Sequence, residues 1–285
     1  MKLLVVGAAG QLGSTFAGVP GHDVIGVTRA DVDVRDHAAL LAIVERICPD
    51  AIVNCTAYND VDGAEDDPAT ALAVNALAVR SMAAAAAQVG ATFVHYSTDF
   101  VFDGEAATPY GETDRARPVS VYGCSKLLGE WFAQDAPRWY VLRVESLFGG
   151  PQARSSVDKI AAALREGRSA RVFSDRIVTP SFVGDVRDAT LALLARDVPS
   201  GVFHCVNTGQ ATWFEVGQHI AALLGADPAL LVPTSVHDVQ LRASRPVYCA
   251  LSNAKLASAI GAPLPTWQDA IARYVRTLDT SPHVR

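Results

Sequence analysis

Short apolar runs alternate with longer amphipathic stretches along the first half of the chain. Strands rich in β-branched residues are predicted at 3–6, 24–27, 51–54, 93–96 and 140–144. Helices are predicted between them, at 12–16, 38–47, 69–89 and 122–134. Strands that are apolar on both faces and alternate with helices are typical of a parallel sheet covered on both sides. The pattern predicts an α/β fold with a doubly wound, Rossmann-type parallel sheet.

The pattern changes after residue 148. Helices are predicted at 157–166, 185–195, 214–224 and 267–278, strands at 171–173 and 202–206, and a loop-rich stretch at 228–252. The segment 183–208 has the order helix then strand, so it is expected to return to the first sheet. We therefore expect a Rossmann domain at 1–148 joined by 183–208, and a smaller C-terminal domain at 149–182 and 209–285.

A glycine-rich turn follows the first predicted strand directly. Gly7, Gly10 and Gly13 have the spacing G-x-x-G-x-x-G and lie just before a predicted helix. Glycines allow a tight turn and a close approach of the backbone to a pyrophosphate, whose charge is met by free N–H groups. This context predicts that the 1–148 domain binds a dinucleotide, NAD or NADP.

The end of the second strand bears on the choice between these two cofactors. NAD enzymes usually carry an acidic residue there, which binds the 2′-hydroxyl of the ribose. Here the chain has Arg29, whose charge and fork geometry suit a 2′-phosphate. Asp31 and Asp33 follow, and either acid can accept a hydrogen bond from a ribose or adenine. NADPH is the expected cofactor, with NADH as the alternative.

Tyr122 and Lys126 are separated by one helical turn, so both side chains lie on the same face of a predicted helix. A phenol has a pKa near 10, which must fall for rapid proton exchange at neutral pH. A lysine ammonium group one turn away, together with an oxidised nicotinamide, supplies charge of the required sign. The pair predicts acid–base chemistry.

Hydroxyl groups also occur at the end of the fourth strand, where ligands bind in open α/β sheets. Ser97 and Thr98 stand there, followed by Asp99. Either hydroxyl can donate a hydrogen bond to a substrate carbonyl, although such residues are often simple caps. The residues themselves do not favour one over the other.

These elements, in this order, resemble the extended short-chain dehydrogenase/reductases. Further segments are similar to the dTDP-4-dehydrorhamnose reductase family and extend the resemblance over nearly the whole chain: 54–65, 73–76, 97–104, 109–112, 122–130, 201–204, 213–215 and 245–246. The resemblance implies hydride transfer from NADPH or NADH to C4 of a dTDP-4-dehydro-6-deoxyhexose, most directly dTDP-4-dehydrorhamnose in dTDP-L-rhamnose biosynthesis.

The resemblance also implies roles for individual residues. Tyr122 would donate the proton, Lys126 would hold the nicotinamide ribose, and Thr98 with Asp99 would bind the reacting sugar oxygen. The cofactor would contact three further groups: the pyrophosphate loop (Gly7, Gly10, Gln11, Leu12, Gly13), the adenine side (Asp33, Val34) and the third-strand loop (Thr56, Ala57, Tyr58).

Two positions depart from the family pattern. Family members often have an R-T-S-W stretch after the fifth strand, where the tryptophan touches the sugar nucleotide. Here residues 143–146 are R-V-E-S, which puts Ser146 at the tryptophan position. Arg176 stands in place of glutamine in the family segment D-Q-x-G-x-P-T. Both changes fall in the substrate region, so a different hexose or nucleotide remains an alternative.

Other functions share parts of this pattern. Sugar-nucleotide dehydratases resemble one another in a Thr-Asp-Glu triplet whose glutamate removes a proton, and Phe100 stands at that third position here. An epimerase remains open, as does a non-catalytic NADP-binding protein like the regulatory subunit of methionine adenosyltransferase. Retention of Thr98, Tyr122 and Lys126 favours an enzyme.

Composition narrows the expected partners and location. The net charge is −6 and no basic block occurs, so neither nucleic acid nor an anionic membrane is expected as a partner. A small sugar nucleotide is the expected partner, and a homodimer is open. The apolar run at 3–6 is too short for a signal segment, which favours the cytoplasm. Five scattered cysteines show no metal-ligand spacing, so no metal site is predicted; Mg²⁺ held by surface carboxylates would leave no trace in the sequence.

Overall fold

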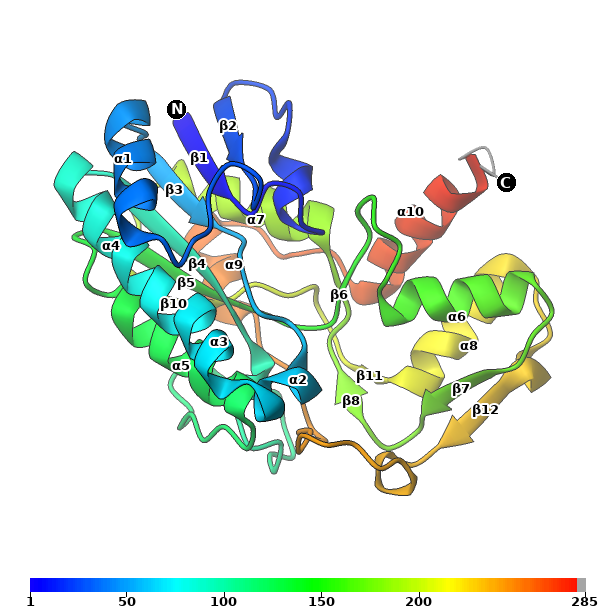
Figure 1. The fold of residues 1–285 in the computed structure, drawn as a ribbon. Helices are drawn as coiled ribbons and strands as arrows, with labels where there is room; N and C mark the ends of the chain where they lie inside the picture. Colours follow the sequence, from blue (N-terminus) through cyan, green and yellow to red (C-terminus); the bar gives the residue numbers. More distant parts are fainter. Residues whose placement is uncertain (281–285) are drawn as a thin grey trace.

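The computed structural model describes residues 1–280 and contains a six-stranded parallel sheet (Figure 1). The sheet order is β10-β5-β4-β3-β1-β2. Its strands are β1 (Lys2–Val6), β2 (Asp23–Val27), β3 (Ala51–Asn54), β4 (Thr92–Thr98), β5 (Trp139–Val144) and β10 (Gly201–His204). The predicted α/β fold with a Rossmann-type sheet is confirmed.

The order of the strands determines where a ligand can bind. From β1 the chain first adds β2 on one side and then returns to add β3 on the other side. The loops that leave β1 and β3 therefore diverge at the carboxyl edge of the sheet, which opens a crevice between them. The glycine-rich turn leaves β1 at this point.

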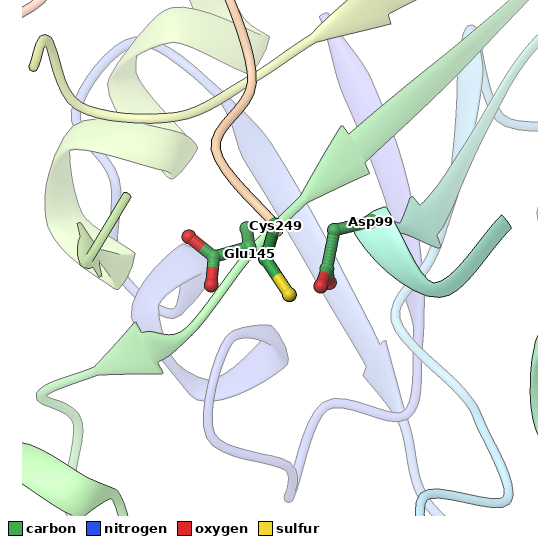
Figure 2. A group of neighbouring side chains, drawn as sticks. All are labelled: Asp99, Glu145 and Cys249. Carbon is green, nitrogen blue, oxygen red and sulfur yellow. The ribbon is translucent and has the colours of Figure 1, made fainter. Parts of the chain in front are cut away.

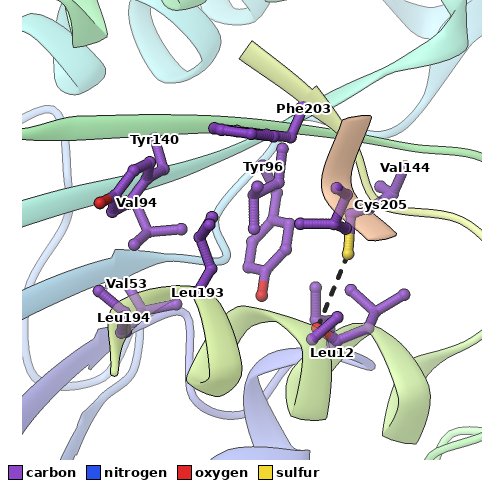
Figure 3. Close-up of a cluster of buried hydrophobic side chains, with 14 of the residues drawn as sticks. Leu12, Val53, Val94, Tyr96, Tyr140, Val144, Leu193, Leu194, Phe203 and Cys205 are labelled. Carbon is purple, nitrogen blue, oxygen red and sulfur yellow. Dashed lines mark hydrogen bonds between the residues drawn. The ribbon is translucent and has the colours of Figure 1, made fainter. Parts of the chain in front are cut away.

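Helices cover both faces of the sheet. One face packs against α1 (His37–Ile47), α4 (Ala78–Val89) and α5 (Val121–Ala133) through Leu4, Val6 and Ile52. The other face packs against α7 (Val183–Leu194) and α9 (Ala254–Ile260) through Leu3, Val5 and Val53. Figure 3 shows Val53 in this core with Leu193 and Leu194 of α7. Neighbouring strand residues thus enter different cores, as the alternation of a buried strand requires.

A smaller part with its own core lies beside the sheet, on the right in Figure 1. Its core includes Phe148, Ile160, Trp213 and Tyr274. Its elements are β6 (Leu147–Phe148), α6 (Ser156–Arg165), β7 (Ala170–Phe173), β8 (Ile177–Val178), β9 (Ser181–Phe182), β11 (Ala211–Thr212), α8 (Trp213–Leu224), β12 (Leu231–Thr234) and α10 (Trp267–Thr280). The domain boundaries remain a prediction. Helix α9 (Ala254–Ile260) packs against the sheet, although its residues belong to the range 209–285 that was expected in the second domain.

Some elements differ from the prediction. The helix predicted at 12–16 is only a 3₁₀ turn, Gly13–Phe16, because Gly18 takes a positive φ of 70° and Pro20 follows. The helix predicted at 69–89 is divided into α3 (Pro68–Leu72), a π-helical turn (Ala73–Leu77) and α4. Strand β12 lies in the predicted loop region, and neither α2 (Val61–Asp66) nor α9 was predicted.

Within residues 1–280, one helical stretch is long and apolar enough to cross a membrane. It is Pro68–Val89, with a window of mean hydropathy 1.4. Half of that window is buried, and α4 packs against α1, α5 and the sheet. The core helix of a globular protein has the same composition, so this stretch is weak evidence for a membrane span.

Candidate active site

A cavity of about 1340 Å³ runs from the carboxyl edge of the sheet into the smaller part of the protein. Nearly all the residues predicted to bind cofactor or substrate line it: Gly7, Gly10, Gln11, Leu12, Arg29, Asp33, Val34, Thr56, Ala57, Tyr58, Thr98, Asp99, Tyr122, Lys126 and Ser146. Gly13 is the exception. The fold thus brings residues from six separate segments to one space.

The glycine-rich turn is built for close backbone contacts. Gly7 has a φ of 87°, and a Cβ there would lie 3.0 Å from the carbonyl carbon of Cys55. A Cβ on Gly13 would lie 2.3 Å from the Gly7 carbonyl oxygen, so only glycine lets the backbone at residue 13 pack this closely against the turn. The Gln11 amide donates to the carbonyl oxygens of Leu147 and Gly149, at 3.3 and 3.0 Å. The Gln11 side chain therefore ties the turn to the segment that enters the smaller part.

The end of the cavity that is predicted to hold the adenine carries two arginines. Arg29 and Arg35 both line it, and Arg35 donates to the carboxylate of Asp33 at 2.5 Å. This hydrogen bond is the main reason why the pKa of Asp33 lies well below its usual range. Asp33 is thus already paired, whereas Arg29 is exposed. The sequence prediction included Arg29 but missed Arg35, because a single arginine in a loop carries no distinguishing pattern.

The loop after β3 is fixed by two asparagines. Asn54 accepts hydrogen bonds from the backbone N–H and the hydroxyl group of Thr56, at 3.0 and 2.6 Å. Asn75 accepts from the Tyr58 N–H at 2.8 Å and donates to Ser125 at 2.9 Å. Asn75 lies in the π-helical turn, a distortion that is frequent at functional sites. It links the predicted cofactor loop to α5.

Helix α5 brings Tyr122 and Lys126 to the cavity. Gly123 lets the helix come close to the loop after β4, because a Cβ there would lie 2.3 Å from the Phe100 carbonyl oxygen. The Tyr122 ring packs edge-on against Phe100, with ring centroids 5.6 Å apart. Burial raises the pKa of Tyr122 above its usual value, as does the charge of Asp99, while a hydrogen bond with Thr98 lowers it.

Lys126 is almost fully buried, and its ammonium group donates to the Tyr96 carbonyl oxygen at 2.6 Å. Burial lowers its pKa to about 8, and the neighbouring carboxylate of Glu130 opposes this shift. Glu130 is held by Arg143 in a buried two-point ion pair, at 2.8 and 2.7 Å. The buried lysine thus stays positively charged at neutral pH.

Thr98 lies at the carboxyl end of β4. Its hydroxyl group donates to Asp99 Oδ1 at 2.8 Å and accepts from the Phe100 N–H at 3.2 Å. Ser97, the alternative from the sequence, instead donates to Glu130 at 2.6 Å and is buried. Both residues line the cavity, and their hydroxyl groups donate to different carboxylates, Glu130 for Ser97 and Asp99 for Thr98.

Among residues 1–280, one group of side chains has the spacing of a metal site: Asp99, Glu145 and Cys249 (Figure 2). One ligand atom from each lies within 4.8 Å of the others, and all three residues are buried. The guanidinium group of Arg176 lies beside them, donates to Cys249 at 3.5 Å and supplies a positive charge. We therefore assign no metal to this group. Its members are too far apart in the sequence for any spacing to reveal them.

Glu145 also shapes the segment that carries Ser146. It accepts hydrogen bonds from the Ser146 hydroxyl group at 2.6 Å and from the Thr179 N–H. Ser146 has a φ of 45°, a conformation that non-glycine residues rarely adopt. Glu145 thus holds together the segment after β5 and the segment before β9.

The chain is similar to a known protein family and to several individual proteins. The RmlD substrate binding domain family matches residues 1–280. A "dTDP-4-dehydrorhamnose reductase" from Burkholderia thailandensis is 36% identical over 98% of this chain and 99% of its own length. A "Probable dTDP-4,6-dihydroxy-2-methyloxan-3-one 4-ketoreductase" from Streptomyces antibioticus is 34% identical over 95% and 93%.

A similar solved structure contains NADP. It is the dTDP-4-dehydrorhamnose reductase from Bacillus anthracis in complex with NADP, which is 27% identical and superposes with a TM-score of 0.91. The match covers 97% of this chain and 99% of that chain. The similarity therefore includes both the sheet and the smaller part.

Proposed function

The chain belongs to the dTDP-4-dehydrorhamnose reductase family of NAD(P)H-dependent sugar-nucleotide oxidoreductases, and from this premise we propose that it reduces the 4-keto group of a dTDP-4-dehydro-6-deoxyhexose with NADPH. The first candidate for the substrate is dTDP-4-dehydrorhamnose. A relative named as a probable 4-ketoreductase of another dTDP sugar is 34% identical to the chain, so the sugar is part of the proposal.

One observation carries the proposal: Thr98, Tyr122 and Lys126 converge on the cavity that begins at the glycine-rich turn. Two of them come from α5 and one from the end of β4. A hydroxyl donor, a phenol and an ammonium group in one buried place are the groups that protonation of a ketone oxygen requires.

The cavity also fits the cofactor. At Gly7 and Gly13 a Cβ would collide with neighbouring backbone atoms. Because these residues have no side chain, the backbone of the turn can lie close to a pyrophosphate. When bound, the reduced nicotinamide supplies the hydride that goes to C4 of the sugar. The residues that would hold this cofactor are the turn, Arg29, Thr56 to Tyr58 and Lys126.

The chain's own groups move the proton. Thr98 and Tyr122 would hold the ketone oxygen, and the Tyr122 phenol would transfer its proton to that oxygen as the alcohol forms. The positive charge of Lys126 favours the tyrosinate that remains. Since Lys126 loses its proton near pH 8, this support weakens as the pH rises through that value.

Arg29 and Arg35 support NADPH over NADH. We expect Arg29→Ala to raise the KM for NADPH about tenfold, because the guanidinium group that would pair with the 2′-phosphate is lost. The KM for NADH should change less than about twofold. Arg46→Ala removes an exposed charge outside the cavity and serves as the control. Equal effects on both cofactors would contradict the assignment.

The direct test follows NADPH absorbance after addition of dTDP-4-dehydrorhamnose, with NADH in a parallel assay. Oxidation of NADPH with equimolar dTDP-rhamnose formation is the expected result. If NADPH binds in calorimetry but is not oxidised with this or any other dTDP-4-dehydro-6-deoxyhexose, the proposed function is wrong.

A further inference from the structure

Two buried carboxyl groups lie at the substrate end of the cavity. Asp99 and Glu145 are 4% and 2% exposed, and one oxygen of each lies within 4.8 Å of the other (Figure 2). Two carboxylates at this distance and burial do not both stay ionised, because their repulsion is weakly screened. The expected state is one proton shared by the pair.

The surrounding charges agree with a single proton. Arg176 brings one positive charge from the segment before β8, which balances one carboxylate. Cys249 faces the pair from the segment near 250, and Tyr122 faces Asp99 from α5. Arg245 lies beyond, over the same Phe100 ring as Arg176. One cation, two carboxyl groups and one proton leave the group close to neutral.

Hydrogen bonds indicate which carboxyl group carries the proton. Glu145 accepts two hydrogen bonds, from Ser146 and Thr179, and such bonds favour the ionised form. Asp99 Oδ1 has one partner, Thr98, whereas Asp99 Oδ2 is buried with no hydrogen-bond partner. An ionised Asp99 would leave negative charge on this unpaired buried oxygen, so Asp99 is the better place for the proton, on Oδ1, which faces the Thr98 hydroxyl group.

The protonation state of Asp99 determines whether Thr98 can donate to a ketone oxygen, because Thr98 has only one hydroxyl hydrogen. An ionised Asp99 accepts that hydrogen at Oδ1 and leaves none for a ketone oxygen. A neutral Asp99 can itself donate to Thr98 and releases the hydrogen. The charge of an ionised Asp99 also raises the pKa of Tyr122, which opposes transfer of the phenol proton.

We propose that Glu145 is a positioning residue: by sharing one proton with Asp99, it keeps Asp99 neutral and leaves the Thr98 hydroxyl hydrogen for the substrate's ketone oxygen. This inference rests on the proposed function. Burial raises the pKa of both carboxyl groups, Asp99 and Glu145. The reduction rate should fall as the pH rises and the second carboxyl group ionises.

Glu145→Gln removes one acid from the pair. Asp99 then faces Arg176 alone and ionises at lower pH. We expect kcat at neutral pH to fall about tenfold with KM nearly unchanged, and the upper limit of the pH profile to move down by about one unit or more. Asp158→Asn, which removes another buried acid but lies outside the cavity lining, should not move the profile. A Glu145→Gln profile that coincides with that of the wild type would overturn the inference.

Asp99→Asn gives a second test, because the asparagine amide can donate to Thr98 as a neutral Asp99 would. In this background Glu145→Gln should change kcat by less than about twofold, since no proton remains to be shared. An equally large effect in both backgrounds would mean that Glu145 only supports the fold, and would overturn the inference.

Infrared difference spectra separate this inference from the proposed function. The NADPH-bound protein, without substrate, should lose the band of one protonated carboxyl group between about pH 6 and about pH 9. Asp99→Asn should abolish this change. If the wild type reduces no sugar nucleotide, the proposed function fails, yet these spectra still decide whether the proton is shared. Absence of the band in the wild type would overturn the inference alone.

Discussion

Tyr122→Phe lowers kcat for reduction of the sugar nucleotide by about a thousandfold, because the ring stays in place while the proton donor is lost. The ring packs edge-on against Phe100 and is buried, so the phenylalanine side chain fills the same space. The dissociation constant for NADPH should change less than about threefold, since the phenol proton is needed only as the alcohol forms. Steady-state kinetics and calorimetry on the same preparation measure both values.

Tyr248→Phe is the matched control for this variant. Its hydroxyl group donates to Gln210 at 2.5 Å and does not line the cavity. Loss of that hydroxyl group should leave kcat within about twofold of the wild type. A Tyr122→Phe enzyme that retains more than about a tenth of the activity would show that another group, or water, donates the proton.

Glu130→Gln lowers the free energy of unfolding by about 3–5 kcal/mol, the largest effect on stability that we expect. The Glu130 and Arg143 side chains are 3% and 6% exposed and joined by two hydrogen bonds. The amide keeps the shape of the carboxylate but not its charge, so Arg143 is left buried without a counter-ion. Urea unfolding followed by tryptophan fluorescence measures the loss.

Glu166→Gln provides the comparison on the surface. Glu166 and Arg168 also form a close ion pair, but their side chains are 58% and 61% exposed. An ion pair in water contributes less than about 1 kcal/mol, so this variant should unfold almost like the wild type. Equal losses from the two variants would mean that burial of the Glu130–Arg143 pair does not make it important for stability.

The parts of the site that sequence predicts well are those with local spacing. The glycine turn after β1 and the one-turn separation of Tyr122 from Lys126 are fixed by a few consecutive residues, and the structure places them on one cavity. The strands of the sheet are equally local, because each is a short apolar run with clear ends. The roles of the glycine turn, Tyr122 and Lys126 remain part of the proposal.

Other features depend on contacts between distant segments. Asp99, Glu145, Arg176 and Cys249 come together only when the segments after β4 and β5 meet those near β8 and residue 250. The pairing of Glu130 with Arg143 depends on α5 lying on the sheet beside β5. No spacing along the chain contains this information.

Local signals also explain the elements that sequence analysis missed. Strand β12 contains Pro233, a residue typical of loops, yet it pairs with β7 in a two-stranded sheet, where a proline is tolerated because each strand has a free edge. Helices α2 and α9 have six and seven residues, too few to show a helical period.

The position of β10 has a consequence for synthesis on the ribosome. This strand completes the six-stranded sheet beside β5, but it ends at His204, after α6 and strands β6 to β9 have been made. Domains generally fold as units as the chain emerges. The edge of β5 therefore stays unpaired in the nascent sheet while much of the smaller part is translated. An exposed edge strand can pair with another chain. The order of the elements along the chain thus sets a period of synthesis in which the edge of β5 is open to pairing with another chain.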